Sequence, residues 1–200
     1  MHLAWREVLE QTAQELDDDF DLRESVVLDA CSLAIEHGQA LRQLLGEGLQ
    51  TSALALMRVQ HEALLRAAWL AFAAKDDQIR TLAAPHTLAT LRKANDLPLS
   101  GVLLKQVEAS SCPPALKKGL REFRGLSWDG ANSYTHSGLL PLGRVDTGHP
   151  EPYLIQMVQV SNAHSYAAHM LAAGILDPAS APGDLNVVAV AHPGCMRGAT

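Results

Sequence analysis

Apolar side chains recur at helical spacing over residues 22–46. Because the intervals are three, four or eight positions, they predict an amphipathic helix with one buried face. Asp21 precedes this stretch and suits the N-cap, since its carboxylate can accept a hydrogen bond from an early backbone N–H. Gly46 and Gly48 are expected to end the helix. The apolar residues that set the spacing are Leu22, Val26, Ala30, Leu33 and Leu41.

The next stretch, from Thr51 or Ser52 as N-cap to about Ala74, is apolar on nearly every side. A helix of this kind usually lies at the centre of its bundle. The polar interruptions are Arg58, Gln60, His61, Glu62 and Arg66. We therefore expect this helix to be the core element and its few polar residues to have partners.

Shorter helical patterns fill most of the remaining chain, and no strand alternation interrupts them before residue 177. They cover residues 3–16, 76–95 with a break at Pro85, 101–109, 115–124, 127–136 and 152–173, with a loop over 137–152. The sequence thus predicts an all-α protein, a multi-helix up-and-down bundle formed by residues 1–176.

After Asp177 the composition changes to Pro, Ala, Ser and Gly. Within the tail, residues 177–200, the segment LNVVAVA at 185–191 has strand-like content. We expect an irregular tail with a possible short strand that docks on the bundle or on a second copy. An unstructured tail is the alternative.

Composition limits the possible functions. The 200 residues suit one domain, and with only 4% aromatic residues the core must consist mainly of Leu and Ala. A net charge of -6 argues against non-specific binding to nucleic acid or anionic lipid. The three cysteines, Cys31, Cys112 and Cys195, are far apart, which favours reduced thiols in a cytoplasmic protein over a disulfide framework or zinc site. No cofactor motif is present.

Targeting and membrane signals are also missing from the sequence pattern. Arg6 and Glu7 interrupt the region where a signal peptide needs its apolar run. The longest unbroken apolar stretch, residues 67–74, is far shorter than the roughly 20 residues of a membrane span. The sequence therefore predicts a chain that does not cross a membrane.

The first candidate site lies on the central helix. Arg58, Glu62 and Arg66 are spaced four apart and share one helix surface, with His61 at its border. Unpaired charges on an otherwise apolar helix would be costly. These residues therefore either line a polar pocket with a positioned guanidinium or form an ion-pair network that fixes helix register.

The second candidate is the segment SWDGANSYTHSG at 127–138. A helix would gather four polar residues on one face, flanked by Trp128 and Tyr134. They are Asp129, Asn132, Ser133 and His136. His136 could act as a general acid or base, since its unperturbed pKa lies near ~6.5. The alternative is that this face bonds to the central helix and holds the bundle together.

The third candidate is a basic stripe on the 115–124 helix. Lys117, Arg121 and Arg124 share one face, beside Lys118. Such a stripe could bind a phosphate backbone or an acidic partner protein, or it could simply be a solvated surface. His164 and His169 are five apart and do not form the i, i+4 pair typical of a metal site.

The central-helix sequence MRVQHEALLRAAWLAF and the later NSYTHSG segment resemble bacterial families of unknown function in the HEPN-like helical-bundle group. In the resembling families an Arg and a Glu four residues on begin the apolar helix, and a Ser/His segment packs opposite. The matching residues here are Arg58, Glu62, Ser133 and His136. The resemblance implies that the two polar strips face each other.

The wider group includes metal-independent ribonucleases, toxins, defence proteins and inactive partners. Its active members resemble one another in an Arg-x(4–6)-His motif, and His136 has no Arg at that distance before it. The pairs Arg80–His86 and Arg144–His149 fit the spacing, but chance alone produces such pairs.

Three hypotheses follow. The first is a non-enzymatic HEPN-like protein that binds a protein partner, such as a cognate toxin, in bacterial defence or immunity. The second is a metal-independent ribonuclease or nucleotide-handling enzyme, with His136 as acid/base, Arg58 on the phosphate and the basic stripe as RNA track. The third is a structural homodimer in which Arg58, Glu62 and His136 only hold the helices together.

Overall fold

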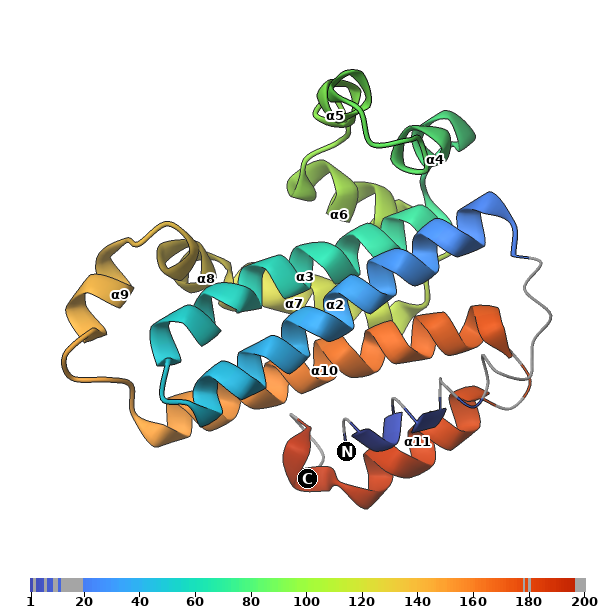
Figure 1. Ribbon diagram of the computed structural model, residues 1–200. Coiled ribbons are helices and arrows are strands. Elements are labelled where there is room, and N and C mark those ends of the chain that lie inside the picture. The colour runs from blue at the N-terminus through green and yellow to red at the C-terminus, as the bar shows by residue number, and fades with distance from the viewer. Residues whose placement is uncertain are drawn as a thin grey trace.

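A computed structural model describes residues 1, 3–5, 7–8, 11, 20–177, 179 and 181–196. Over these residues the chain is all-α, as the sequence predicts, and no strand is present. Figure 1 shows three long helices side by side: α2 (Leu22–Gly46), α3 (Gln50–Phe72) and α10 (Glu151–Leu176). Shorter helices cover the outer faces of this layer.

Helix α2 begins where the sequence predicts. The Asp21 carboxylate accepts the backbone N–H of Glu24 at 2.8 Å, and the Glu24 side chain accepts the N–H of Asp21 in return, which completes a capping box. A short turn then leads into α3, with Gly48 at φ +77°, a conformation that glycine adopts without strain. Because this turn is short, α2 and α3 form an antiparallel pair.

Helix α3 is the central element, as its apolar pattern predicts. It contacts α2, α6, α7, α8 and α10, and nearly every side chain from Ala63 to Leu70 is buried. Its start differs from the expected cap: Gln50 is the first helical residue and Leu49 the N-cap, without a side-chain hydrogen bond. The predicted caps Thr51 and Ser52 therefore lie inside the first turn.

The shorter helices follow the predicted segments, with one addition. They are α4 (Asp76–Leu82), α5 (Leu88–Ala94), α6 (Ser100–Ala109), α7 (Pro114–Leu126), α8 (Trp128–Thr135) and α9 (Leu139–Arg144). Helix α9 lies within the segment 137–152 that the sequence predicts to be a loop. Gly138 before the helix and Pro141 and Gly143 within it locally indicate a loop.

The C-terminal segment is helical where the sequence suggests a strand. Residues 185–191 lie within α11 (Ala181–Ala191), which packs on α10 and is followed by the short 3₁₀ turn η1 (Pro193–Cys195). A strand would need a neighbouring strand for its backbone groups, and the described chain offers none, whereas a helix pairs them internally.

The beginning of the chain lies beside this C-terminal helix. Trp5 is fully buried and its indole N–H donates to the carbonyl of Leu185 at 3.3 Å. Figure 1 places the N-terminus next to α11, below α10. Of the helix predicted for residues 3–16, the described residues 3–5, 7–8 and 11 are helical, and the others lie outside the described part.

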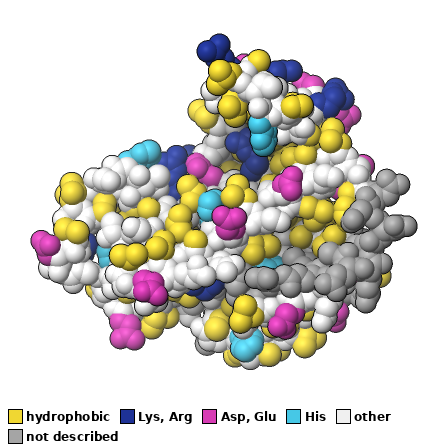
Figure 2. Space-filling model, viewed as in Figure 1, with side chains coloured by type: hydrophobic (Ala, Val, Ile, Leu, Met, Phe, Trp, Pro, Cys, Tyr) yellow, Lys and Arg dark blue, Asp and Glu magenta, His cyan; other side chains and the backbone are white. Residues whose placement is uncertain are grey.

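The described helices include none that combines the length and the apolar character needed to cross a bilayer. Figure 2 shows acidic and basic side chains scattered over the visible face, with hydrophobic side chains between them. No single charged patch dominates this face, so a candidate site must be found from specific contacts.

Candidate functional site

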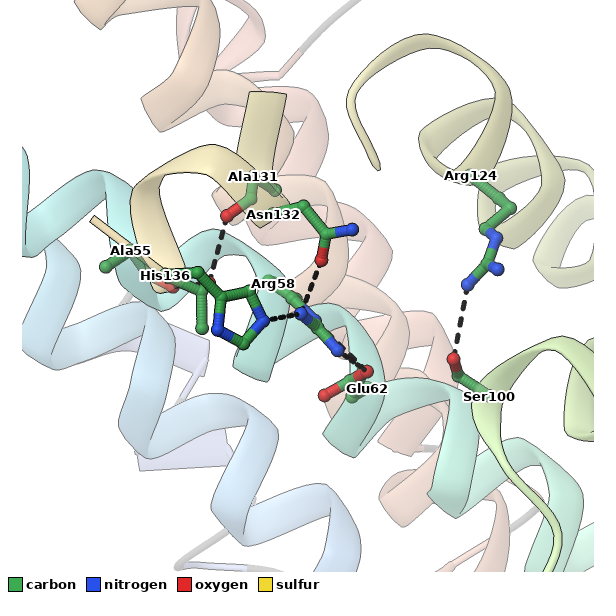
Figure 3. Close-up of polar contacts among 9 residues, drawn as sticks. Ala55, Arg58, Glu62, Ser100, Arg124, Ala131, Asn132 and His136 are labelled. Atoms are coloured by element: carbon green, nitrogen blue, oxygen red, sulfur yellow. Dashed lines mark hydrogen bonds and ion pairs between the residues drawn. The ribbon is translucent and has the colours of Figure 1, made fainter. Parts of the chain in front are cut away.

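Arg58 lies at the point where α3 meets α8. Its Nη1 donates to the side-chain carbonyl of Asn132 and lies 2.7 Å from Nε2 of His136, as Figure 3 shows. A guanidinium can only donate, so Nε2 of His136 is the acceptor and the ring proton is on Nδ1. The polar strip of the central helix and that of segment 127–138 therefore meet at the Arg58 side chain, as the resemblance implies.

The other edge of the Arg58 guanidinium faces Glu62, one turn further along α3. Nε and Nη2 both approach a single carboxylate oxygen, Oε1, at 3.3 and 3.2 Å. The side chains are 20% and 33% exposed, and i, i+4 pairs of this kind contribute about 0.3–0.5 kcal/mol. Water therefore reaches this edge, and the ion pair is weak.

Trp128 lies between two arginines. The guanidinium carbon of Arg124 lies 3.7 Å from its ring centroid and that of Arg58 lies 5.0 Å from it, which are cation–π distances. Arg124 also donates to the hydroxyl of Ser100 at 3.2 Å, so it joins the end of α7 to the start of α6. The indole thus supports both cations at the junction of α7 and α8.

Thr135 provides a second tie between α8 and α3. Its hydroxyl lies 2.9 Å from the carbonyl of Ala131 and 3.3 Å from the carbonyl of Ala55. No sequence pattern selects Thr135, because a threonine near the end of a short helix usually bonds only to its own backbone.

The other candidates on α8 have separate surroundings. Ser133 accepts the backbone N–H of Leu140 at 3.0 Å and so shapes the turn into α9. Asp129 is exposed in the first turn of α8. The buried Tyr134 bonds to His149, whose backbone and ring N–H groups donate to Gln50. These three do not join the Arg58 cluster.

Burial raises the pKa of Tyr134 to about 12, with a further contribution from Tyr153. His149 also has a pKa lowered by burial and then by Arg144. The sequence pattern singles out His149 only through its spacing from Arg144 and does not select Gln50, since both residues lie at segment ends without periodic signal. The network holds the start of α10 against the start of α3 rather than forming a second site.

His61 points into the core, where its ring lies edge-on to Trp128 with 6.0 Å between the ring centroids, and it does not bond to Arg58. It is fully buried, stacks on Phe123 at 4.3 Å, and its Nδ1 lies 3.1 Å from Nε2 of His164. His164 Nδ1 donates to the carbonyl of Val160 at 2.8 Å, so His164 Nε2 must accept from His61. Nε2 of His61 is then an acceptor, without a partner among the described residues.

Burial lowers the pKa of His61 well below 6.5, and the nearby His164 and Arg124 lower it further. The pKa of His164 is lowered by burial too, although its hydrogen bond to Val160 opposes the shift. Both rings are therefore neutral at physiological pH. The pair is a polar core contact between α3 and α10.

The basic stripe does not form one continuous surface. Lys117 donates to the carbonyl of Ser110 at 2.6 Å, at the end of α6. Arg121 pairs with Glu108 at 3.4 Å, whereas Arg124 lies on Trp128. Only Arg124 belongs to the neighbourhood of Arg58.

Arg66 continues the polar strip of α3 beyond Glu62. Its guanidinium lies over Trp69, 5.8 Å from the ring centroid. Its Nη1 is buried, and no group in the described part of the chain accepts a hydrogen bond from it. Burial lowers the pKa of Arg66, while Glu62 raises it.

The polar strip of α3, together with the neighbouring Arg124 of α7, thus carries three guanidinium groups and one carboxylate. The cations are Arg58, Arg66 and Arg124, and the carboxylate is Glu62. In a protein with a net charge of -6 this local excess favours a negatively charged group. Among the described residues, no three His, Cys, Asp or Glu side chains lie close enough together to hold a metal ion.

A separate groove of about 1130 Å³ runs between α7 and α10, with α2 and α3 at its base. Its walls are mostly Ala, Leu, Val and Gly, including Gly119, Leu120, Ala167 and Leu171. None of the Arg58 cluster lines it. The molecule therefore offers a polar cluster and an apolar groove at two different places.

Comparison with known proteins finds no matching curated protein and no matching solved structure. One family model, described as a family of unknown function, DUF6988, matches residues 31–198. That range includes α3, α8 and all the contacts of Arg58 described above. The chain therefore belongs to the DUF6988 family.

Proposed function

We propose that the protein is a non-enzymatic, HEPN-like helical protein that binds a protein partner. The observation that carries this proposal is the use of Arg58 by the protein's own side chains. All three guanidinium nitrogens already bond within the protein. Nη1 bonds to Asn132 and His136, and Nε and Nη2 bond to Glu62. A catalytic guanidinium would instead be expected to point at the place where a substrate reacts.

The surroundings of His136 support the same proposal. Its Nε2 already accepts from Arg58, so that nitrogen is not free to take a proton from a substrate. Ser133 is engaged in the turn to α9. Lys117 and Arg121 bond to the end of α6 and to Glu108, which leaves little of the basic stripe to track an RNA backbone.

The groove between α7 and α10 adds a second support. Grooves between helices with apolar walls can receive the apolar face of a partner helix, and this groove has a volume of about 1130 Å³. Bacterial defence, immunity or antitoxin activity, with a cognate toxin as partner in the cytoplasm, is the setting that fits a helical binding protein.

The test is co-expression with the product of the neighbouring gene, followed by purification through a tag on this chain. Stable co-purification, together with intact RNA after prolonged incubation with the purified protein, is the expected result. Cleavage of RNA by the native protein but not by His136→Ala would contradict a non-enzymatic function.

One observation favours the second candidate, a metal-independent ribonuclease. Arg58 and His136 are in contact, and a phosphate that displaced this contact would meet a guanidinium and an imidazole together. The matched variants are His136→Ala and His149→Ala, because His149 is a histidine outside the Arg58 cluster. A ribonuclease would lose cleavage with the first variant and retain it with the second.

The third candidate, a structural homodimer, is tested by the mass of the purified chain in solution. A dimer that persists at nanomolar concentration, and that binds no other protein on co-expression, would favour it over partner binding.

A further inference from the structure

The two edges of the Arg58 guanidinium are held in different ways. Nη1 is fixed by Asn132 and His136 of α8. Nε and Nη2 reach only Oε1 of Glu62, at 3.3 and 3.2 Å. Charge-assisted hydrogen bonds normally measure about 2.7–2.9 Å, so the contact with Glu62 is long. Asn132 and His136 hold one edge firmly, whereas the edge that faces Glu62 is held loosely at a partly exposed position.

Glu62 has a second basic neighbour within reach. Arg66 lies four residues further along the same helix, which places it beside Glu62 on the helix surface. Its Nη1 is buried without an acceptor among the described residues. A buried donor in this state is expected to gain stability from any acceptor that reaches it.

We propose that Glu62 is an internal placeholder for a carboxylate of the partner protein. An Asp or Glu side chain of the partner binds the Nε/Nη2 edge of Arg58, and the displaced Glu62 carboxylate turns to Arg66. This inference rests on the proposed function, since it names the chemistry by which the partner is recognised.

A carboxylate fits this edge for two reasons. The group that occupies it now is itself a carboxylate, so the edge is already shaped for that geometry. The side chains around it contribute the guanidinium groups of Arg58, Arg66 and Arg124 against one carboxylate, which leaves the cluster attractive to a second negative group. An acidic segment of a partner brings this charge without requiring a phosphate.

The experiment measures binding of a labelled hexaglutamate peptide, blocked at both ends, by fluorescence anisotropy at low salt. A hexaglutamine peptide with the same label is the control. We expect the native protein to bind the acidic peptide and not the neutral one. Glu62→Gln should tighten binding by about tenfold, because the variant lacks the negative charge that competes with the peptide for the Nε/Nη2 edge of Arg58.

Arg58→Met should abolish binding, and Arg121→Met, which alters an exposed cation on α7, should leave it unchanged. Arg66→Met should weaken binding in the native background, because the displaced Glu62 carboxylate loses the hydrogen-bond donor to which it turns. In the Glu62→Gln background the same change should weaken binding less, because only the general attraction of the Arg66 charge is then lost. Equal weakening in both backgrounds would mean that Arg66 has only a structural role.

Three results would overturn the placeholder role: no peptide binding, no gain from Glu62→Gln, or displacement of the peptide by inorganic phosphate far better than by acetate at equal ionic strength. The last would assign the site to a phosphate. Co-purification of a partner despite these failures would leave the proposed function standing. RNA cleavage alongside successful peptide results would refute the proposed function alone.

Discussion

Nε2 of His136 lies 2.7 Å from Nη1 of Arg58, although 78 positions separate the two residues in the chain. This contact joins the central helix α3 to the short helix α8. The same guanidinium bonds to Asn132 and lies over Trp128, so one side chain of α3 contacts two residues of α8 and its C-cap, His136. The position of α8 therefore depends on Arg58.

Arg58→Ala is expected to lower the free energy of unfolding by about 1.5–3 kcal/mol, because hydrogen bonds to a charged group are lost and Asn132 is left without its donor. Urea unfolding followed by circular dichroism measures this change. Arg121→Ala, which removes only an exposed ion pair, should cost less than about 0.5 kcal/mol. Equal losses in the two variants would show that Arg58 does not hold α8.

Glu62→Ala is expected to lower the free energy of unfolding far less than Arg58→Ala, by about 0.5 kcal/mol or less. The ion pair between Glu62 and Arg58 is partly exposed, and its N–O distance of 3.2 Å is long. Thermal unfolding of the two variants in parallel provides the comparison. If Glu62 were an essential member of a buried network, its loss would approach the cost for Arg58, and the placeholder role would be weakened.

The buried pair His61 and His164 predicts a loss of stability in acid. Both pKa values lie below the ordinary value of 6.5, so the unfolded chain binds protons more readily than the folded one. Stability is thus complete above about pH 6.5 and falls as the pH drops below it. His149, whose pKa is also lowered, contributes in the same direction.

The measurement is the free energy of unfolding between pH 5 and pH 8 for the native chain and for His61→Phe. The aromatic variant keeps the stacking on Phe123 but cannot be protonated, so its acid loss should be smaller. His86→Gln, which changes an exposed ring, is the control and should follow the native curve. A His61→Phe curve that matches the native slope would contradict the prediction.

Gly38→Ala should destabilise the protein by about 1–3 kcal/mol. A Cβ at this position would lie under 3.0 Å from both Ser165 and Gln60. These two side chains bond to each other where α2, α3 and α10 meet, with Gln60 Nε2 donating to the Ser165 hydroxyl at 3.0 Å.

The matched change is Gly174→Ala in α10, where a Cβ meets no atom within 4 Å. This substitution should be neutral or stabilising by about 0.5–1 kcal/mol, because alanine favours the helix. Denaturant unfolding of both variants tests the pair. A Gly38→Ala variant as stable as the Gly174→Ala variant would show that the close approach of the helices can relax.

Several elements could be read from the sequence because local rules govern them. The spacing of apolar residues and the N-cap Asp21 define α2, and the nearly complete apolar surface of α3 identifies it as the central helix. Pro85 separates α4 from α5 as expected. In each case the signal lies within a few residues and depends on the period of the helix.

Tertiary packing decided the elements whose local signals are ambiguous. The valine-rich segment 185–191 favours a strand by propensity, yet it is helical in α11, because α10 offers an apolar surface and the described residues include no edge strand. The short helix α9 likewise forms although Gly138, Pro141 and Gly143 locally indicate a loop.

The site divides in the same way. The sequence by itself determined that Arg58, Glu62 and Arg66 share one face of a helix, since that follows from their spacing. Only the tertiary structure decided that Arg58 meets His136 and Asn132, that His61 turns into the core, and that the basic stripe is dispersed among separate partners. Helical periodicity fixes neighbours along one helix, whereas contacts between helices depend on the packing of the whole bundle.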